Sequence, residues 1–247
     1  MKNYIYEAST KELEDFIINI KNYFKKSPNS IHKARNEIKI INTKDKDFVV
    51  KSFKIPHILN KIIYTFFRDS KAKKSYDNTL KTIEFTPNPI GYIEFRKHGL
   101  IDESYFISEH FDYNFTIREP LLENDFPDKE GIFKSFAAFT LELHEKNIFH
   151  LDYSPGNILI KKEKDIYNFK IVDINRMEFK PLNLDERLKN FAKLWAKDDD
   201  LKIIIKEYAR LINKNEEQCI KTALKHSQAH KDRKNAKKRL RGIAVVD

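Results

Sequence analysis

The chain contains very little cysteine and no long apolar run. One cysteine, Cys219, occurs in 247 residues, which excludes a disulfide framework and a cysteine-rich zinc site. No stretch approaches the ~18 uncharged apolar residues of a membrane-spanning helix, and the N-terminal residues lack the apolar segment of a signal peptide. We therefore expect a protein that works in a reducing compartment, the cytoplasm.

Glycine is also scarce. The chain has five glycines, and the first of them is Gly91. Residues 31–55 are rich in β-branched and aromatic side chains, which predicts strands. Without glycine, these strands contain no glycine-rich loop of the kind that folds closely around phosphate groups. Lys33 and Arg35 are the residues of this region that could supply positive charge to a phosphate instead.

The composition is that of a globular protein with a basic surface. Hydrophobic residues make up 40% of the chain and aromatic residues 13%, which is enough to build a core. The formal net charge of +10 favours an anionic partner such as nucleic acid, lipid headgroups or a phosphorylated glycan. The chain contains no helix-turn-helix, zinc-finger or RNA-binding signature, so we expect no nucleic acid among the partners.

One segment has the pattern of a phosphoryl-transfer loop. His150–Asn157 reads His-x-Asp-x-x-x-x-Asn, in which Asp152 and Asn157 are five residues apart. A short apolar strand, a polar turn over 161–168 and a second apolar strand lead to Asp173, sixteen residues after Asn157. The pattern predicts that Asp152 is the catalytic residue that orients or deprotonates an acceptor hydroxyl, and that Asn157 and Asp173 bind Mg²⁺.

The histidines near this loop are expected to be structural. His150 opens the loop and is assigned an orienting role rather than proton transfer. His144 lies near the end of an amphipathic helix predicted over 129–149, where packing or capping is the more common role. Pro155 and Gly156 give the tight turn that lets the chain double back before the first strand.

The nucleotide side of the site is predicted from the N-terminal half. The strand that ends in Lys51 resembles the kinase strand whose lysine pairs with the α- and β-phosphates. Lys51 is favoured over Lys54, whose side chain points to the opposite face of the strand. The helices predicted over 57–84 would carry an acid that faces this lysine, and Asp77 is the favoured residue. Each of these residues taken alone could instead be a solvated surface group.

The strand predicted over 105–108 leads to the position of an interlobe hinge. Glu109, His110 and Phe111 occupy this position, and their backbone groups would bind the adenine of ATP. An ordinary loop between two lobes is compatible with the same residues.

The stretch after Asp173 is short. Only about ten residues separate Asp173 from the next predicted helix, which Asn183 can cap. A protein kinase places a long activation segment here, so its absence argues for a small-molecule or glycan acceptor rather than a peptide. Arg176 is close enough in sequence to meet an anionic acceptor group, and a structural salt bridge is equally compatible.

The C-terminal part of the chain, residues 184–241, is predicted to be helical and ends in a basic run. The basic residues of this run are Lys231, Arg233, Lys234, Lys237, Lys238, Arg239 and Arg241. Such a helix often rests on anionic lipid or a polyanion. We expect peripheral contact with an anionic membrane, and a solvated terminal helix is the alternative.

Several of these segments together resemble the bacterial lipopolysaccharide kinase (Kdo kinase-like) family of the protein-kinase-like superfamily. The likeness runs from about residue 30 to about residue 200, and its most specific parts are the catalytic loop and Asp-Ile-Asn-Arg-Met after it. The segments that carry it are Arg35–Lys39, Val49–Lys51, Thr86–Gly91, Tyr105–Glu109, His150–Leu159 and Val172–Met177.

The resemblance implies an α+β, bilobal protein-kinase-like fold. A small antiparallel β N-lobe would span about 1–108, a hinge about 109–113, and a mostly helical C-lobe about 114–247. The resemblance also implies ATP- and Mg²⁺-dependent phosphorylation of a sugar hydroxyl, of Kdo or heptose, in the lipopolysaccharide inner core. The acceptor would be a lipid-linked anionic glycan at the cytoplasmic face of the inner membrane.

Two other functions stay open. Aminoglycoside- and choline-type phosphotransferases use the same His-x-Asp-x-x-x-x-Asn pattern, although an acidic acceptor cleft would suit their cationic substrates better than a basic surplus. A non-catalytic scaffold with a kinase-like fold is suggested by the missing glycines, and a lack of Mg·ATP binding would favour it.

Overall fold

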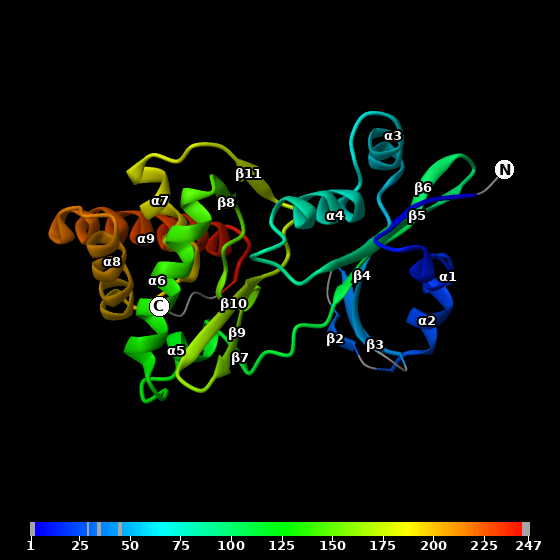
Figure 1. Ribbon diagram of the computed structural model, residues 1–247. Coiled ribbons are helices and arrows are strands. Elements are labelled where there is room, and N and C mark those ends of the chain that lie inside the picture. The colour runs from blue at the N-terminus through cyan, green and yellow to red at the C-terminus, as the bar shows by residue number, and fades with distance from the viewer. Residues whose placement is uncertain (1–2, 29, 34–35, 44–45, 244–247) are drawn as a thin grey trace. The chain divides into compact units, whose positions relative to one another are not determined.

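The computed structural model describes residues 3–28, 30–33, 36–43 and 46–243. The chain divides into two compact units. The first comprises the residues up to Asp112 together with Asp173–Asn175, and the second comprises Tyr113–Val172 together with the residues from Arg176 onward (Figure 1). Within the described ranges, no helix combines the length and apolar character needed to cross a bilayer.

A six-stranded antiparallel sheet forms the centre of the first unit, with the order β1-β5-β6-β4-β3-β2. Its strands are β1 (Tyr4–Ala8), β2 (Ser30–Lys33), β3 (Glu37–Asn42), β4 (Asp47–Phe53), β5 (Pro89–Lys97) and β6 (Leu100–Glu109). The strands predicted over 31–55 are confirmed as β2 to β4, whereas the sequence pattern does not predict β1. His98 and Gly99, with φ of 52° and 78°, close the β5–β6 hairpin in the left-handed conformation that two-residue turns require.

The helices of the first unit are short. They are η1 (Lys11–Leu13), α1 (Glu14–Ile18), α2 (Ile20–Lys26), α3 (Ile58–Phe66) and α4 (Lys71–Lys81). Asn19 ends α1 and begins α2, so these two helices are separate although they are adjacent in the chain. Both helices contribute to the core of the unit, since Ile17 and Ile20 pack in one cluster with Ile107 of the sheet.

Helices dominate the second unit. They are α5 (Arg118–Leu122), α6 (Lys129–Glu145), η2 (Pro155–Asn157), α7 (Leu184–Asn190), η3 (Phe191–Leu194), α8 (Asp198–Leu211) and α9 (Glu216–Arg239). The strands β10 (Ile166–Ile171), β9 (Ile158–Glu163) and β7 (Phe115–Thr116) form one sheet, and β11 (Met177–Phe179) pairs with β8 (Ile148–His150). Phe133, Phe136 and Tyr208 are fully buried in the core of this unit. The predicted α+β class is confirmed, with an antiparallel sheet in the N-terminal part and helices in the C-terminal part.

One helix of the second unit ends earlier than its pattern predicts. The helix expected over 129–149 stops at Glu145, because Asn147 adopts the left-handed conformation with a φ of 59° and β8 then begins. The next predicted helix start is confirmed. Asn183 caps α7 and forms a capping box with Glu186, which satisfies two backbone donors at the helix start.

The β9–β10 hairpin is longer than predicted. The polar turn expected over 161–168 contracts to Lys164 and Asp165, because strand pairing continues to the Glu163–Ile166 pair. The polar side chains of this hairpin lie mostly on exposed strand positions, where they are solvated without breaking the ladder. Polar residues in sequence therefore do not by themselves mark a turn, because exposed strand positions also carry them.

Candidate active site

The catalytic loop begins where β8 ends, and the side chain of His150 holds it. His150 is 1% exposed. Its Nδ1 accepts a hydrogen bond from the backbone N–H of Asp152 at 3.0 Å, and its Nε2 lies 3.0 Å from the carbonyl oxygen of Val172. An imidazole that accepts at Nδ1 donates at Nε2, so the two bonds select one tautomer. His150 therefore links the loop to the end of β10, which suits the predicted orienting role.

Asn157 is fixed at the other end of the loop. Its side-chain Nδ2 donates to the backbone carbonyl oxygen of Asp152 at 2.9 Å. Its backbone carbonyl oxygen accepts the N–H of Val172, also at 2.9 Å. Within the described residues, Oδ1 of Asn157 has no hydrogen-bond partner. A Cβ at position 156 would lie 2.6 Å from Nη2 of Arg118, so a larger residue there would require the flexible Arg118 side chain to shift.

The carboxylate of Asp152 lies in a positive environment. Nη2 of Arg176 is 3.3 Å from Oδ2 of Asp152, and Lys193 also lies within electrostatic range. Arg176 is held in place because its carbonyl oxygen accepts the N–H of Leu151 at 3.1 Å. Of the two roles that the sequence leaves open for Arg176, the structure contains the salt bridge. The Arg176 side chain is still 64% exposed, so the guanidinium stays accessible to a ligand.

Asp173 belongs to the first unit, where it pairs with the predicted nucleotide lysine. Its backbone is left-handed, with a φ of 58°. Its Oδ1 accepts from Nζ of Lys51 at 2.6 Å and from Nδ2 of Asn175 at 2.6 Å, and Oδ2 has no partner in the described part of the chain. Asn78 of α4 donates to the carbonyl oxygen of Ile174 at 2.7 Å. Nothing in the sequence indicates this role of Asn78 except its position next to Asp77.

The structure separates Lys51 from Lys54 and does not bring Asp77 to either. Lys51 is buried and paired with Asp173, whereas Lys54 is exposed. Asp77 accepts a hydrogen bond from Nζ of Lys73 at 2.5 Å, one helical turn earlier on α4. This bond raises the pKa of Lys73. The described residues contain no Asp77–Lys51 ion pair, so the acid expected to face the nucleotide lysine is engaged on its own helix.

The backbone donors of the predicted hinge are partly used by the sheet. The N–H of Glu109 donates to the carbonyl oxygen of Asn88 at 2.9 Å, and the N–H of His110 donates to that of Asp47 at 2.9 Å. The N–H of Phe111 has no acceptor within the described residues. Among the three predicted adenine-binding donors, Phe111 is therefore the available one.

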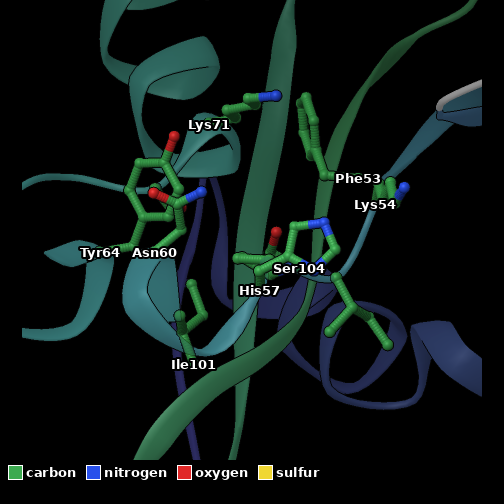
Figure 2. Close-up of a pocket in the computed structure, with 11 residues that line it drawn as sticks. Phe53, Lys54, His57, Asn60, Tyr64, Lys71, Ile101 and Ser104 are labelled. Carbon is green, nitrogen blue, oxygen red and sulfur yellow. The ribbon is translucent and has the colours of Figure 1, made fainter. Parts of the chain in front are cut away.

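A cavity of about 270 Å³ opens in the first unit beyond the end of β4. Figure 2 shows it between α3, which contributes Asn60 and Tyr64, and residues such as His57 and Ser104. Lys54 lines this cavity, but Lys51, Asp77 and Asp173 do not. The cavity is thus separate from the Lys51–Asp173 pair.

A buried relay supports the catalytic loop in the second unit. Nδ1 of His144 lies 2.8 Å from the hydroxyl of Tyr208, and its Nε2 lies 3.2 Å from Oδ1 of Asn190. Nδ2 of Asn190 donates to the carbonyl oxygen of His150 at 3.0 Å. Burial lowers the pKa of His144 to about 4, so its ring is neutral at pH 7. The packing role predicted for His144 is confirmed, while Asn190 carries no sequence signal beyond its place at the end of α7.

Each of the two units has a side-chain oxygen that suits Mg²⁺ held together with a nucleotide. Oδ1 of Asn157 and Oδ2 of Asp173 are hard oxygen donors, and Mg²⁺ is commonly held by one or two protein carboxylates together with waters and phosphates. Among the described residues, no group of three or more His, Cys, Asp or Glu side chains could form an all-protein metal cage. Arg35 and the side chain of Lys33, considered above as phosphate ligands, lie outside the described part.

Comparison with known proteins identifies the fold. The sequence matches no protein-family model and no curated protein. The structure is similar to a solved structure described as WaaP in complex with acyl carrier protein, with a TM-score of 0.58 and 12% sequence identity. The match covers 92% of this chain and 98% of that chain. The chain therefore has a kinase-like fold, and its function has to be argued from its own residues.

Proposed function

We propose that the protein is an ATP- and Mg²⁺-dependent kinase that phosphorylates a sugar hydroxyl, of Kdo or heptose, in the lipopolysaccharide inner core. The observation that carries the proposal is the ordered loop in which His150 and Asn157 fix the backbone of Asp152. A loop of this kind offers one carboxylate to an acceptor hydroxyl and one amide oxygen to a metal ion. The fold, which is similar to that of WaaP, is compatible with this reaction.

Each residue has a defined part in the proposed reaction. Asp152 accepts the proton of the sugar hydroxyl or orients the hydroxyl for attack. Lys51 neutralises the α- and β-phosphates, and the N–H of Phe111, with the neighbouring backbone of Glu109 and His110, holds the adenine. Phosphoryl transfer needs little covalent help from the protein, so positioning and charge stabilisation account for most of the rate enhancement.

Mg²⁺, when bound, neutralises charge on the nucleotide phosphates. Asn157 and Asp173 are its proposed ligands, through Oδ1 and Oδ2. The chain connection supports their joint action, because Asp173 directly follows Val172, whose N–H binds the carbonyl oxygen of Asn157 at 2.9 Å. Asp77, paired with Lys73, has no direct part in holding the nucleotide in this proposal.

The chain after Asp173 supports a small or glycan acceptor. β11 begins at Met177 and pairs with β8 in a register that sets Met177 opposite His150. The chain therefore returns to the catalytic loop within a few residues, where a protein kinase has a long peptide-docking segment. This short return favours an acceptor whose hydroxyl reaches Asp152 without a docked peptide.

The charge around Asp152 favours an anionic acceptor over a cationic one. Arg176, 3.3 Å from Asp152 and largely exposed, would repel an aminoglycoside or choline and attract a phosphate or carboxylate. A phosphotransferase for cationic substrates is thus the weaker proposal. A non-catalytic scaffold is weaker still, because the base, the lysine and both metal-ligand positions are all occupied by residues with the required chemistry.

A lipid-linked acceptor would bring the enzyme to the cytoplasmic face of a membrane. The basic residues at the end of α9, predicted to contact anionic lipid, would then lie against headgroups. WaaP is described in complex with acyl carrier protein, so co-purification with acyl carrier protein is a second partner test for this chain.

The proposal is tested with purified protein, Mg·ATP and a panel of acceptors. The panel contains Kdo- and heptose-bearing lipopolysaccharide cores, an aminoglycoside and choline, and products are identified by mass spectrometry. We expect one added phosphate on a core sugar and none on the cationic acceptors. Phosphate on the aminoglycoside alone would replace the proposal with its runner-up, and no product together with no thermal shift by Mg·ATP would replace it with the scaffold.

A further inference from the structure

A group of cationic side chains near Asp152 takes no part in the proposed phosphoryl transfer. Its members, here called the cationic cluster, are Arg176, Lys193, Arg233 and Lys234. Lys193 lies on η3, three residues after Asn190, whose side chain binds the catalytic loop at His150. The contact of Asn190 with the loop therefore holds Lys193 near Asp152, with which it interacts electrostatically.

Helix α9 brings the other members of the cluster to η3. The ring of Trp195, next to η3, meets the ring of His230 edge-on at a centroid distance of 6.0 Å. Nζ of Lys231 donates to the carbonyl oxygen of Ala196 at 2.8 Å. Arg233 and Lys234 follow directly on the same helix, so they are held beside Lys193 by packing rather than by an ion pair.

The charge neighbours of Lys193 are mostly positive. Its side chain is half-buried, and burial, followed by Arg233 and Lys234, lowers its pKa, while Asp152 opposes the shift. Neither Lys193 nor Lys234 has an ion-pair partner among the described residues. Arg233 contacts Nδ1 of His230 at 3.3 Å.

His230 does not relieve this excess of charge. Burial, together with the positive charges of Lys193, Lys234 and Arg233, lowers the pKa of His230 to about 4, so its ring is neutral at pH 7. Arg176 and Lys193 thus lie near the carboxylate of Asp152, and the exposed side chains of Arg233 and Lys234 add positive charge beside the half-buried Lys193. Like charges held together in this way are unfavourable unless an anion joins them, and such arrangements concentrate at functional sites.

We propose that the cationic cluster is a subsite for an anionic group of the acceptor, a phosphate or a carboxylate close to the hydroxyl that Asp152 orients. The inference deepens the proposed function and rests on it, because it requires the acceptor to reach Asp152. It also reassigns two residues of the basic C-terminal helix. Arg233 and Lys234 face the substrate, and the residues from Lys237 onward are left for lipid.

The subsite is tested with Lys193→Met, which keeps the length of the side chain and removes its charge. Lys225→Met is the matched control, since Lys225 is an exposed lysine of α9 outside the cluster. Inorganic phosphate binding to the unliganded protein is measured by calorimetry, and KM is measured for core acceptors that carry either phosphate or carboxylate next to the accepting sugar. We expect Lys193→Met to weaken phosphate binding and to raise the acceptor KM by about tenfold or more, the worth of one hydrogen bond to a charged group.

The outcomes separate the subsite from the proposed function. Equal phosphate affinity in wild type, Lys193→Met and Lys225→Met would overturn the subsite. A raised KM for ATP with an unchanged acceptor KM would assign the cluster to the nucleotide and overturn it as well. Phosphate binding that depends on Lys193 in a protein that phosphorylates no acceptor would support the subsite and overturn the proposed function. Whichever acceptor loses more affinity in Lys193→Met identifies the anion as phosphate or carboxylate.

A different observation, in the first unit, carries a second inference. Helix α3 is oriented with its polar face inward. Lys61 forms an ion pair with Asp102 of β6, and Oγ1 of Thr65 accepts the N–H of Ile101 at 2.9 Å. Figure 1 shows α3 as a separate helix beside the β5–β6 hairpin. A surface helix of a soluble protein ordinarily turns its apolar stripe to the core, so α3 is inverted.

The outward face of α3 is a continuous apolar ridge. Its exposed residues are Ile58, Leu59, Ile62, Ile63, Phe66 and the C-cap residue Phe67, and the last two are 68% and 77% exposed. The helical spacing places these side chains on one side. An exposed patch of this kind marks an interaction site rather than scattered surface residues.

The surroundings of the ridge are basic. Between Lys54 and Lys74 the chain has six Lys and Arg residues and one acid, Asp69. A single convex helix with an apolar face and basic flanks has the pattern of an interfacial helix. A protein that binds the apolar face of a single helix ordinarily does so with a groove on its own surface. We propose that the α3 ridge inserts into the headgroup region of an anionic bilayer and serves as an apolar anchor of the first unit.

The anchor is tested by flotation with vesicles of phosphatidylglycerol and phosphatidylethanolamine against phosphatidylcholine alone. The double variant Phe66→Ser/Phe67→Ser removes the most exposed rings, and Leu122→Ser, at a 69% exposed site of the second unit, is the control. We expect the double variant to lose at least about tenfold in partitioning to anionic vesicles, given the hydrophobic worth of two phenylalanines, and the control to bind like wild type. Unchanged flotation of the double variant would overturn the anchor. A soluble dimer that the double variant converts to monomer, with no vesicle binding by wild type, would overturn it in favour of a second copy of the chain.

Discussion

The catalytic loop of the second unit and the Lys51–Asp173 pair of the first hold their functional groups by different means. Around Asp152, buried hydrogen bonds from His150 and Asn157 fix the backbone, and Asn190 supports the loop from behind. Around Asp173, the main restraint is a side-chain ion pair of 2.6 Å with Lys51. The loop is built in advance of any ligand, whereas the pair can be exchanged for phosphate and metal contacts.

This difference suggests how the two regions divide the work. A preorganised group contributes to the transition state without reorganisation cost, so changes behind the loop should appear in kcat. A pair that opens when Mg·ATP binds should be sensitive to nucleotide, so changes there should appear in both kcat and the affinity for ATP. The following changes test this division, from the largest expected effect to the smallest.

Replacing the carboxylate of the pair should have the largest effect. Asp173→Asn removes the charged oxygen that is proposed to hold Mg²⁺ and leaves Lys51 without its counter-charge. We expect kcat to fall by about 10²–10⁴-fold, the range for losing a key electrostatic group, and the Mg²⁺ concentration for half-maximal rate to rise. Metal titration of the steady-state rate measures both. Asp165→Ala in the exposed β9–β10 turn is the control, and an Asp173→Asn variant with the activity of this control would contradict the division.

Acid should loosen the relay behind the loop. The pKa of His144 is about 4 in the folded chain and about 6.5 in an unfolded one, so the folded state binds fewer protons. The stability from this residue is fully present above pH ~6.5 and is lost as the pH falls toward about 4, by at most about 3 kcal/mol. Denaturant unfolding of wild type and His144→Gln at several pH values measures the difference. Parallel pH curves for the two proteins would show that His144 does not titrate as described.

Removing the link between relay and loop should change the rate more than nucleotide binding. Asn190→Ala leaves the carbonyl of His150 and Nε2 of His144 without their partner, which costs about 1–3 kcal/mol of stability per unsatisfied buried group. We expect kcat to fall by about tenfold with little change in the KM for ATP, because a displaced loop loses alignment rather than affinity. Asn168→Ala, at an exposed hairpin site, serves as the control. Loss of stability with an unchanged kcat would reduce Asn190 to a packing residue.

The smallest effect is expected for Asp77. It forms a half-buried i,i+4 pair with Lys73, and i,i+4 helix pairs contribute less than about 1 kcal/mol. Asp77→Ala should therefore change the KM for ATP by less than about twofold, within the worth of such a pair, whereas Lys51→Met should impair both ATP binding and turnover. Isothermal titration with Mg·ATP compares the two variants. Equal losses in both would restore Asp77 as the acid that serves Lys51.

The catalytic loop could be predicted because its interactions are local. His150, Asp152 and Asn157 hydrogen-bond to one another within eight residues, so the spacing of residue types already implies the geometry. Lys51 was singled out by the likeness of its strand to the kinase strand, whereas its pairing with Asp173, 122 residues away, was not predicted. The relay through Asn190 could not be predicted, because it joins the ends of two helices that are 46 residues apart at His144 and Asn190.

The nucleotide side was harder to predict because competing partners lie nearby. Asp77 has a lysine one helical turn away, and a sequence alone does not decide which of two lysines an acid will meet. The cationic cluster is similar, since Lys193 and Arg233 come from elements that only the packing of α9 on η3 brings together. A helix was predicted in the region of α3, but the sequence alone could not indicate that its apolar side chains face outward.

The central claim is that Asp152 serves phosphoryl transfer to a core sugar. The most direct measurement is single-turnover transfer from Mg·ATP to a Kdo- and heptose-bearing core acceptor by wild type and Asp152→Asn, with ATP affinity measured in parallel. We expect transfer by wild type, a loss of about 10²–10⁴-fold in the variant, as for removal of a general base, and unchanged ATP binding. Equal transfer rates in the two proteins, at equal ATP affinity, would contradict the assignment of the site.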